Sequence, residues 1–113
     1  MLLASGVLAT AAALAPDSRL AGCGGANPNN QVRSAFELAR ARDFWSHFPS
    51  APRGAPELET DETVYVVVFE GPVQVSKSVT LHDVVCVLRP PSDLYPDGEP
   101  LVYYDVPLEG FKP

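Results

Sequence analysis

Three side chains that could do chemistry lie close together in the second half of the chain: His82, Asp83 and Cys86. An imidazole, a carboxylate and a thiol are the groups of a nucleophilic or zinc-binding site, and His47 could join them from elsewhere. If this segment is a straight strand, however, about 13 Å separates His82 from Cys86. Zinc bonds are roughly 2.0–2.3 Å long, and a Cys–His pair needs hydrogen-bond contact. We therefore predict no catalytic residue here and interpret Cys86 as a small core residue, with an enzyme or metal site as the alternative.

A second group of polar residues, Asp93, Asp97 and Glu99, places three carboxylates in one short segment. Carboxylate oxygens are the ligands that calcium prefers, so these residues are weak candidates for a metal site. The spacing is not that of an EF-hand loop, and Pro96-Asp97-Gly98 is typical of a tight turn. We predict a turn and no bound metal.

Aromatic residues form a third candidate site. They could line a small groove between a helix and a sheet, which would suit a small-ligand carrier. The residues are Trp45, Tyr65, Phe69, Tyr103 and Tyr104. Packing in the core is the simpler interpretation, with the two adjacent tyrosines facing opposite sides of a strand.

The elements that must position these residues begin with a predicted helix over residues 31–48. Asn30 could cap its start and Pro49 would end it. At helical spacing, Leu38, Trp45 and Phe48 share one face. Residues 49–60, rich in proline, predict an extended crossover.

Four segments predict β-strands because they are rich in β-branched and aromatic residues or alternate between apolar and polar. They are residues 63–70, 73–81, 83–89 and 101–106. The predicted fold is α+β, with one N-terminal helix packed on a four-stranded antiparallel meander. Residues 64–69 and 84–88 are apolar throughout, which predicts a sheet with two buried faces. One helix covers only one face, so the crossover, residues 107–113, or another protein must cover the second.

Length and charge narrow the classes of function. A chain of 113 residues has room for one small domain, and its formal net charge of −6 would repel nucleic acid. The sequence has no phosphate-binding glycine loop, no Gly-x-Ser-x-Gly and no His-Glu-x-x-His, so we predict no cofactor.

The beginning of the chain carries an export pattern. Residues 2–15 are an uncharged apolar run, about the length of a signal peptide core and too short to span a bilayer. The following Leu20-Ala21-Gly22-Cys23 resembles the lipobox of bacterial lipoproteins. The resemblance implies a leader over residues 1–22 and a fatty-acylated Cys23 that anchors the protein to a membrane outside the cytoplasm. Residues 23–30 would then be a flexible tether and 31–113 the folded domain.

Two alternatives to lipidation follow from the same residues. Cleavage near Ala13-Leu14-Ala15 would release a soluble secreted protein, and the apolar run could instead be a helix of a cytosolic protein. The two cysteines permit a Cys23–Cys86 disulfide in an exported protein. Lipidation of Cys23 would forbid that bond and leave Cys86 as a lone thiol.

These observations favour an exported, non-enzymatic binding domain of the bacterial cell envelope. Its partner would be a membrane through the lipid anchor, and a protein or a second copy of the chain through the uncovered sheet face. The alternatives are a small-ligand carrier with an apolar cleft between helix and sheet, or an enzyme or metal site around His82, Cys86 and the acidic segment.

Overall fold

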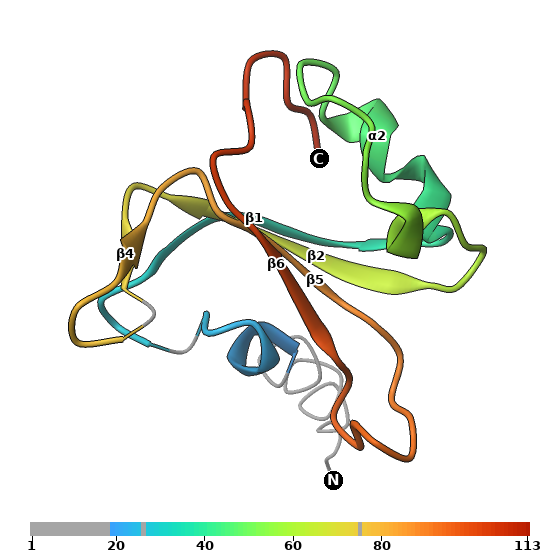
Figure 1. Ribbon diagram of the computed structural model, residues 1–113, viewed down its shortest axis with the longest axis horizontal. Helices are drawn as coiled ribbons and strands as arrows, with labels where there is room; N and C mark the ends of the chain where they lie inside the picture. Colours follow the sequence, from blue (N-terminus) through green and yellow to red (C-terminus); the bar gives the residue numbers. More distant parts are fainter. Residues whose placement is uncertain (1–18, 26, 75) are drawn as a thin grey trace, which may run out of the picture.

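The computed structural model describes residues 19–25, 27–74 and 76–113, and it has the predicted α+β class. Four antiparallel strands form the main sheet in the order β1-β2-β5-β6 (Figure 1). Their bounds are β1 Gln31–Leu38, β2 Val64–Glu70, β5 Val85–Leu88 and β6 Pro100–Tyr103. A separate pair, β3 (Val73–Gln74) and β4 (Thr80–Leu81), is inserted between β2 and β5. The helical elements after β1 are short: η1 (Ala41–Asp43), α2 (Phe44–His47) and η2 (Pro56–Leu58).

The predicted helix over residues 31–48 is wrong for its first half, which forms strand β1. This strand pairs with β2 from Gln31↔Glu70 to Leu38↔Val64, with one irregularity in register beside Arg33. Pairing with β1 satisfies the backbone groups along one edge of β2, and this tertiary gain outweighs the helical preference of the residues in β1. Only η1 and α2 remain of the predicted helix.

The predicted strand over residues 73–81 is also not part of the main sheet. It folds back on itself, so that Val73 pairs with Leu81 and Gln74 with Thr80. The polar residues Ser76, Lys77 and Ser78 lie in the connection, which contains a backbone hydrogen bond from Ser76 to Val79. The other three predicted strands are present within a few residues of their predicted ends. The sheet therefore has four strands in chain order, with β1 in place of residues 73–81.

Residues alternate along β2 between two apolar layers, one on each face of the sheet. Val64, Val66 and Val68 belong to the first layer, and Tyr65, Val67 and Phe69 to the second. Helix α2 with its C-terminal end, the crossover and the C-terminal segment cover the first layer, with Phe44, Phe48, Leu58, Val106 and Phe111. Leu20, Cys23, Val73 and Leu81 cover the second.

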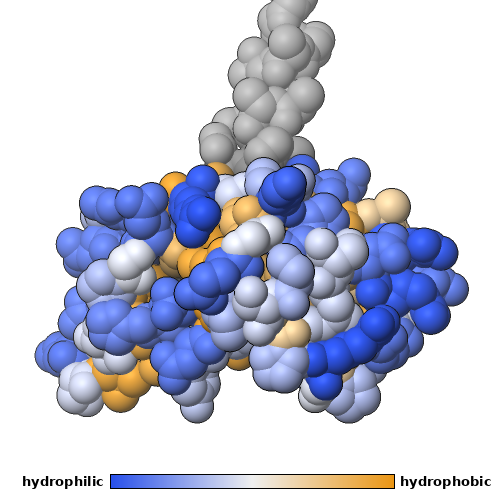
Figure 2. Space-filling view, turned by 90° about the horizontal axis from the view of Figure 1, so that it is seen from above, coloured by the Kyte–Doolittle hydropathy of each residue, from blue (hydrophilic) through white to orange (hydrophobic). Residues whose placement is uncertain are grey.

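The chain therefore covers both faces of its own sheet. Figure 2 shows one side of the molecule, where polar residues predominate and the hydrophobic ones form small separate groups. Val102 of β6, which is 48% exposed, is the main apolar residue left open in the sheet itself. The large uncovered face expected from the sequence is absent from the described part of the chain.

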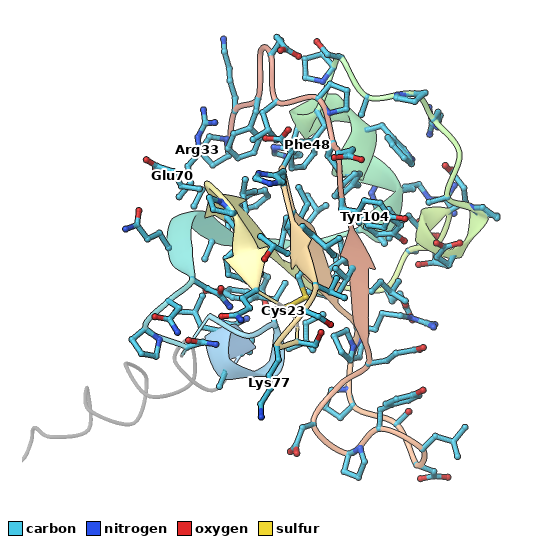
Figure 3. The ribbon with its side chains drawn as sticks, turned by 60° about the vertical axis from the view of Figure 1, so that its left-hand side comes forward. Cys23, Arg33, Phe48, Glu70, Lys77 and Tyr104 are labelled. Carbon is cyan, nitrogen blue, oxygen red and sulfur yellow. A yellow bond between two sulfur atoms is a disulfide. The ribbon has the colours of Figure 1, made fainter. Side chains whose placement is uncertain are left out.

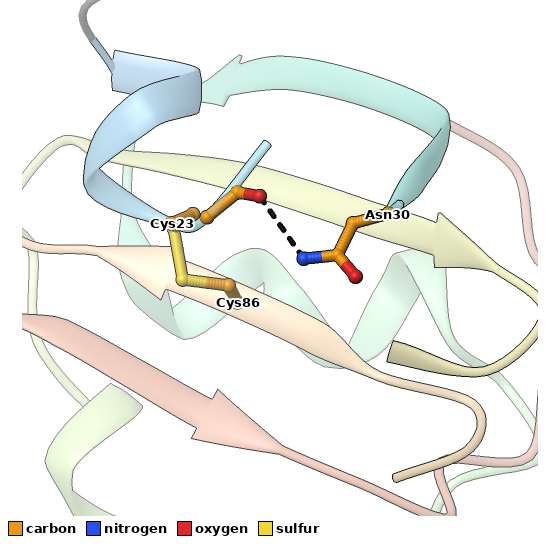
Figure 4. The surroundings of a disulfide bond; sticks show 4 residues. Cys23, Asn30 and Cys86 are labelled. Carbon is orange, nitrogen blue, oxygen red and sulfur yellow. Dashed lines mark hydrogen bonds between the residues drawn. A yellow bond between two sulfur atoms is a disulfide. The ribbon is translucent and has the colours of Figure 1, made fainter. Parts of the chain in front are cut away.

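The segment before β1 packs on the second layer. Residues 19–22 are helical, and Gly25 N–H donates to the Leu20 carbonyl. Asn30 is buried, and its Nδ2 donates to the Gly24 carbonyl (Figure 4). Its Oδ1 accepts from Gln74 N–H. The described residues of the predicted tether over residues 23–30 are thus held by hydrogen bonds within this segment and to β3. Ala26 of this segment lies outside the described residues.

Candidate functional site

The structure does not assemble a site from His82, Cys86 and His47. The Cys86 sulfur is bonded to Cys23, and Cys86 is buried in the second layer (Figure 4). His47 lies on the other face of the sheet, where its ring contacts Phe36 and its Nδ1 lies 2.8 Å from the Lys112 carbonyl oxygen. The interpretation of Cys86 as a core residue is confirmed, and the lone thiol that lipidation of Cys23 would leave is not found, because the structure contains the disulfide.

The disulfide also bears on the lipobox. Cys23 and Cys86 are 63 residues apart in sequence, and their Cα atoms are 5.8 Å apart. A sulfur atom in a disulfide cannot also carry the thioether of a lipoprotein. Of the two alternatives for Cys23, the structure contains the disulfide. The apolar run over residues 2–15 lies outside the described residues.

The acidic segment forms a turn, as predicted. Gly98 has φ +96°, and its N–H donates to the Tyr95 carbonyl. Glu99 does not join the two aspartates, because its carboxylate pairs with Arg89 at 3.1 Å. Within residues 19–25, 27–74 and 76–113, no group of three or more His, Cys, Asp and Glu side chains is placed to hold a metal ion.

An aromatic groove, which was the alternative to core packing, is present with a changed membership, and both Tyr103 and Tyr104 line it, so the prediction that they face opposite sides of the sheet is wrong. A cavity of about 340 Å³ lies between α2, the crossover and the end of β6. Trp45, Tyr103 and Tyr104 line it, together with Phe44. Tyr65 and Phe69 do not, because they pack in the second layer on the opposite face. Figure 3 shows Tyr104 at the end of β6, beside the segment that contains η2. We call this cavity the aromatic pocket.

The remaining lining of the aromatic pocket is apolar or acidic. Small apolar residues of the crossover and of the segment after β6 form the walls between the rings. They are Ala51, Pro52, Gly54, Ala55, Val106 and Pro107. Glu57 and Asp105 are the charged residues of the lining, and both are exposed. Among the residues that the structure describes, no lysine, arginine or histidine lines the pocket.

A hydrogen bond joins the two sides of the aromatic pocket. The Tyr103 hydroxyl donates to Oε2 of Glu57 at 2.7 Å. This bond holds the pKa of Glu57 below its ordinary value. Burial, followed by the same bond, raises the pKa of Tyr103 far above its ordinary range. At neutral pH the phenol is therefore protonated and the carboxylate is ionised.

Two arginines near the pocket already have ion-pair partners. Arg53 contacts Glu59 at 3.2 Å, and Arg89 contacts Glu62 at 2.7 Å as well as Glu99. In the described part of the chain, neither Glu57 nor Asp105 has an ion-pair partner. The indole Nε1 of Trp45 is buried and has no hydrogen-bond partner there either. The pocket thus carries net negative charge beside aromatic rings.

Sequence reasoning missed Glu57 and Asp105. Glu57 is 46 residues from Tyr103 in the chain, and no local pattern announces their contact. Asp105 follows directly after the two tyrosines and adopts φ +55°, a conformation that aspartate tolerates better than most residues. Its position directly after two tyrosines was the feature of the sequence that could have indicated its place in the pocket lining.

Comparisons with known proteins give no family assignment. No protein-family model, no curated protein and no solved structure matches the chain. Among the residues that the structure describes, no helix is both long enough and apolar enough to cross a bilayer.

Proposed function

We propose that this protein is an exported, non-catalytic binding domain whose ligand site is the aromatic pocket. The observation that carries the proposal is the cavity of about 340 Å³ lined by Trp45, Tyr103 and Tyr104. Small-molecule sites are typically clefts of roughly 300–1,000 Å³ with apolar and aromatic walls and a few polar groups. The aromatic pocket has this composition, which supports the small-ligand alternative among the functions expected from the sequence.

A binding role suits the pocket better than catalysis. The Tyr103 phenol has a raised pKa and the Glu57 carboxylate a lowered one. General acid–base catalysis is most effective when the pKa lies near the working pH, and both shifts move away from neutrality. The thiol that an enzymatic alternative would use is oxidised in the Cys23–Cys86 bond.

A protein partner on the second sheet face has less support than the sequence indicated. That expectation rested on a large apolar face without cover. Leu20, Cys23 and the β3–β4 pair now account for most of this cover. A homodimer through the remaining exposed residues, such as Val102, is the competing proposal.

Export is part of the proposal because a disulfide persists in oxidising compartments and because a leader-like run precedes the domain. We place the cleavage before Arg19. Arg19 lies 4.0 Å above the Tyr65 ring, Leu20 packs on the second layer, and Gly22 lies so close to this layer that a Cβ atom there would be 3.3 Å from the Leu88 side chain. Cleavage directly before Cys23 would remove all three contacts. Cleavage near Ala13-Leu14-Ala15 would retain them.

The mass of the mature protein tests this part. The full coding sequence would be expressed in a bacterium and the product recovered from the cell envelope and medium. We expect a soluble product that contains Arg19 and whose mass rises by two hydrogens on reduction. A product that begins at Cys23 with fatty-acyl chains would establish the lipid anchor instead, and an intact cytoplasmic chain would refute export.

Trp45 gives a direct test of the ligand site, because it is the single tryptophan of the chain and it lines the pocket. Small organic probes of neutral, cationic and anionic character would be added at millimolar concentration while indole fluorescence is recorded. We expect at least one class to change the emission in a saturable way, and Tyr104→Ala to abolish the change. Tyr95→Ala is the matched control, since Tyr95 is a similarly exposed tyrosine in the loop at the other end of the sheet. No saturable response to any class would refute the proposal.

A further inference from the structure

We propose that the aromatic pocket selects an organic cation, specifically a quaternary ammonium group. This inference rests on the proposed function and adds the chemical class of the ligand. It follows from the combination of aromatic rings, unpaired carboxylates and few hydrogen-bonding groups around one cavity.

The aromatic residues supply the first part of the selectivity. The faces of tryptophan and tyrosine rings carry negative electrostatic potential and attract cations, and the effect is strongest for tryptophan. Trp45 lies on α2, while Tyr103 and Tyr104 lie at the end of β6, so the rings come from two sides of the cavity. Rings from several directions are the arrangement by which proteins recognise quaternary ammonium groups.

The charges supply the second part. Glu57 and Asp105 line the cavity, and no basic residue of the described ranges does. Arg53 and Arg89 pair with Glu59, Glu62 and Glu99. The charge of Arg89 also contributes to the lowered pKa of Glu57, after the Tyr103 hydrogen bond, but Arg89 forms no ion pair with it. An anionic ligand would therefore be repelled at short range, and a neutral one would gain no charge attraction from the carboxylates.

The scarcity of acceptors distinguishes among cations. A primary ammonium brings three N–H donors and a guanidinium brings five, and each donor that is buried without an acceptor is costly. The side-chain acceptors of the pocket are two carboxylates and the phenol oxygens of Tyr103 and Tyr104, and one carboxylate already accepts the Tyr103 hydroxyl. A quaternary ammonium has no N–H donor and is surrounded by methyl groups. It can lose its water against the rings and small apolar residues without leaving a donor unpaired.

The experiment compares choline with 3,3-dimethylbutan-1-ol, which has the same shape but no charge, using the full mature protein and Trp45 fluorescence. We expect choline to bind about tenfold more tightly than the neutral isostere. Glu57→Gln and Asp105→Asn should each weaken choline binding about three- to tenfold while leaving the affinity for the isostere unchanged. Asn tolerates the positive φ at position 105, so this variant retains the backbone. Asp97→Asn is the control, because Asp97 is an exposed aspartate outside the pocket.

The outcomes separate the inference from the proposed function. If the two probes bind equally, the pocket is a ligand site without charge selectivity and the inference fails alone. If neither binds and no other probe class does, both fail. Binding of choline with no effect of Glu57→Gln or Asp105→Asn would also overturn the inference. Vesicles of phosphatidylcholine, compared with phosphatidylglycerol, distinguish a lipid headgroup from a soluble source of the same cation.

Discussion

The Tyr103 hydroxyl donates a 2.7 Å hydrogen bond to the Glu57 carboxylate, and this contact ties the end of β6 to the crossover. It joins two elements that are distant in the chain at the mouth of the aromatic pocket. The bond orients one ring of the pocket and keeps one of its two carboxylates ionised. The local fold and the proposed ligand site therefore depend on the same pair of side chains.

Replacing the tyrosine tests this pair. Tyr103→Phe should lower the free energy of unfolding by about 0.5–1 kcal/mol at neutral pH, because a partly exposed hydrogen bond to a charged group is lost. The pKa of Glu57 is lowered in the folded protein from its ordinary value of 4.5. The contribution of the Glu57 carboxylate to the free energy of unfolding is therefore present above that value and disappears as the pH falls through the lowered pKa. Urea denaturation should show the two proteins converging in acid, and a constant difference would contradict the contact.

At alkaline pH the same pair gives the opposite pH dependence of stability, because stability is lost as the pH rises. Tyr103 has a raised pKa, so its contribution is complete below the ordinary tyrosine value of 10.0 and is lost as the pH rises toward the raised one. Absorbance titration of the phenolate in the native protein should show that Tyr103→Phe removes a group that ionises only at unusually high pH. Loss of a group that titrates near the ordinary value would show that the phenol is not buried against Glu57.

Removal of the disulfide should have the largest effect on stability. The bond closes a loop across a sequence separation of 63 residues. Restricting an unfolded loop of this length stabilises a protein by about 4 kcal/mol in the chain-entropy model. The double variant Cys23→Ala/Cys86→Ala should lose about this much in urea denaturation. A reducing agent should destabilise the original protein toward the same value and leave the double variant unchanged; equal stability of all samples would refute the bond.

Leu20 tests whether the segment before Cys23 belongs to the folded body. Its side chain packs on the second layer, so Leu20→Ala should cost about 1–2 kcal/mol, less than a fully buried leucine would. Leu94→Ala is the matched control because Leu94 is 86% exposed, and we expect it to leave thermal unfolding unchanged. If both variants unfold like the original protein, residues 19–22 are not part of the domain.

Gly98 tests the turn between β5 and β6. A Cβ atom at this position would lie 2.5 Å from the Arg89 carbonyl oxygen, in a residue with φ +96°. Gly98→Ala should therefore destabilise the protein by about 1–3 kcal/mol. Gly71→Ala separates the cost of a positive φ from the cost of the close approach, because Gly71 has φ +73° with nothing within 4 Å of its Cβ position. A larger loss at Gly71 than at Gly98 in thermal denaturation would contradict the close approach.

Local features of this fold could be predicted from the sequence, and those that depend on distant pairing could not. Strand β2 was predictable because its residues are β-branched and aromatic throughout, and the turn at Gly98 because its residues are typical of one. The residues of β1, including Ala35, Glu37 and Leu38, favour a helix in isolation and become a strand only beside β2.

The candidate site was predictable in part for the same reason. Tyr103 and Tyr104 are neighbours in sequence, and an aromatic groove that includes Trp45 follows from a helix beside a sheet. Glu57 enters the site only because the crossover folds back over β6. The Cys23–Cys86 bond was one of two alternatives, since the choice depends on whether the leader is removed before Cys23.

Fluorescence titration of Trp45 with choline and with 3,3-dimethylbutan-1-ol tests the central claim most directly, because the reporter is a wall of the aromatic pocket itself. The account predicts saturable binding of choline, weaker binding of the neutral isostere, and loss of both responses in Tyr104→Ala but not in Tyr95→Ala. Indole emission that stays unchanged with both compounds and with every other probe class, or that changes equally in the two variants, would contradict it.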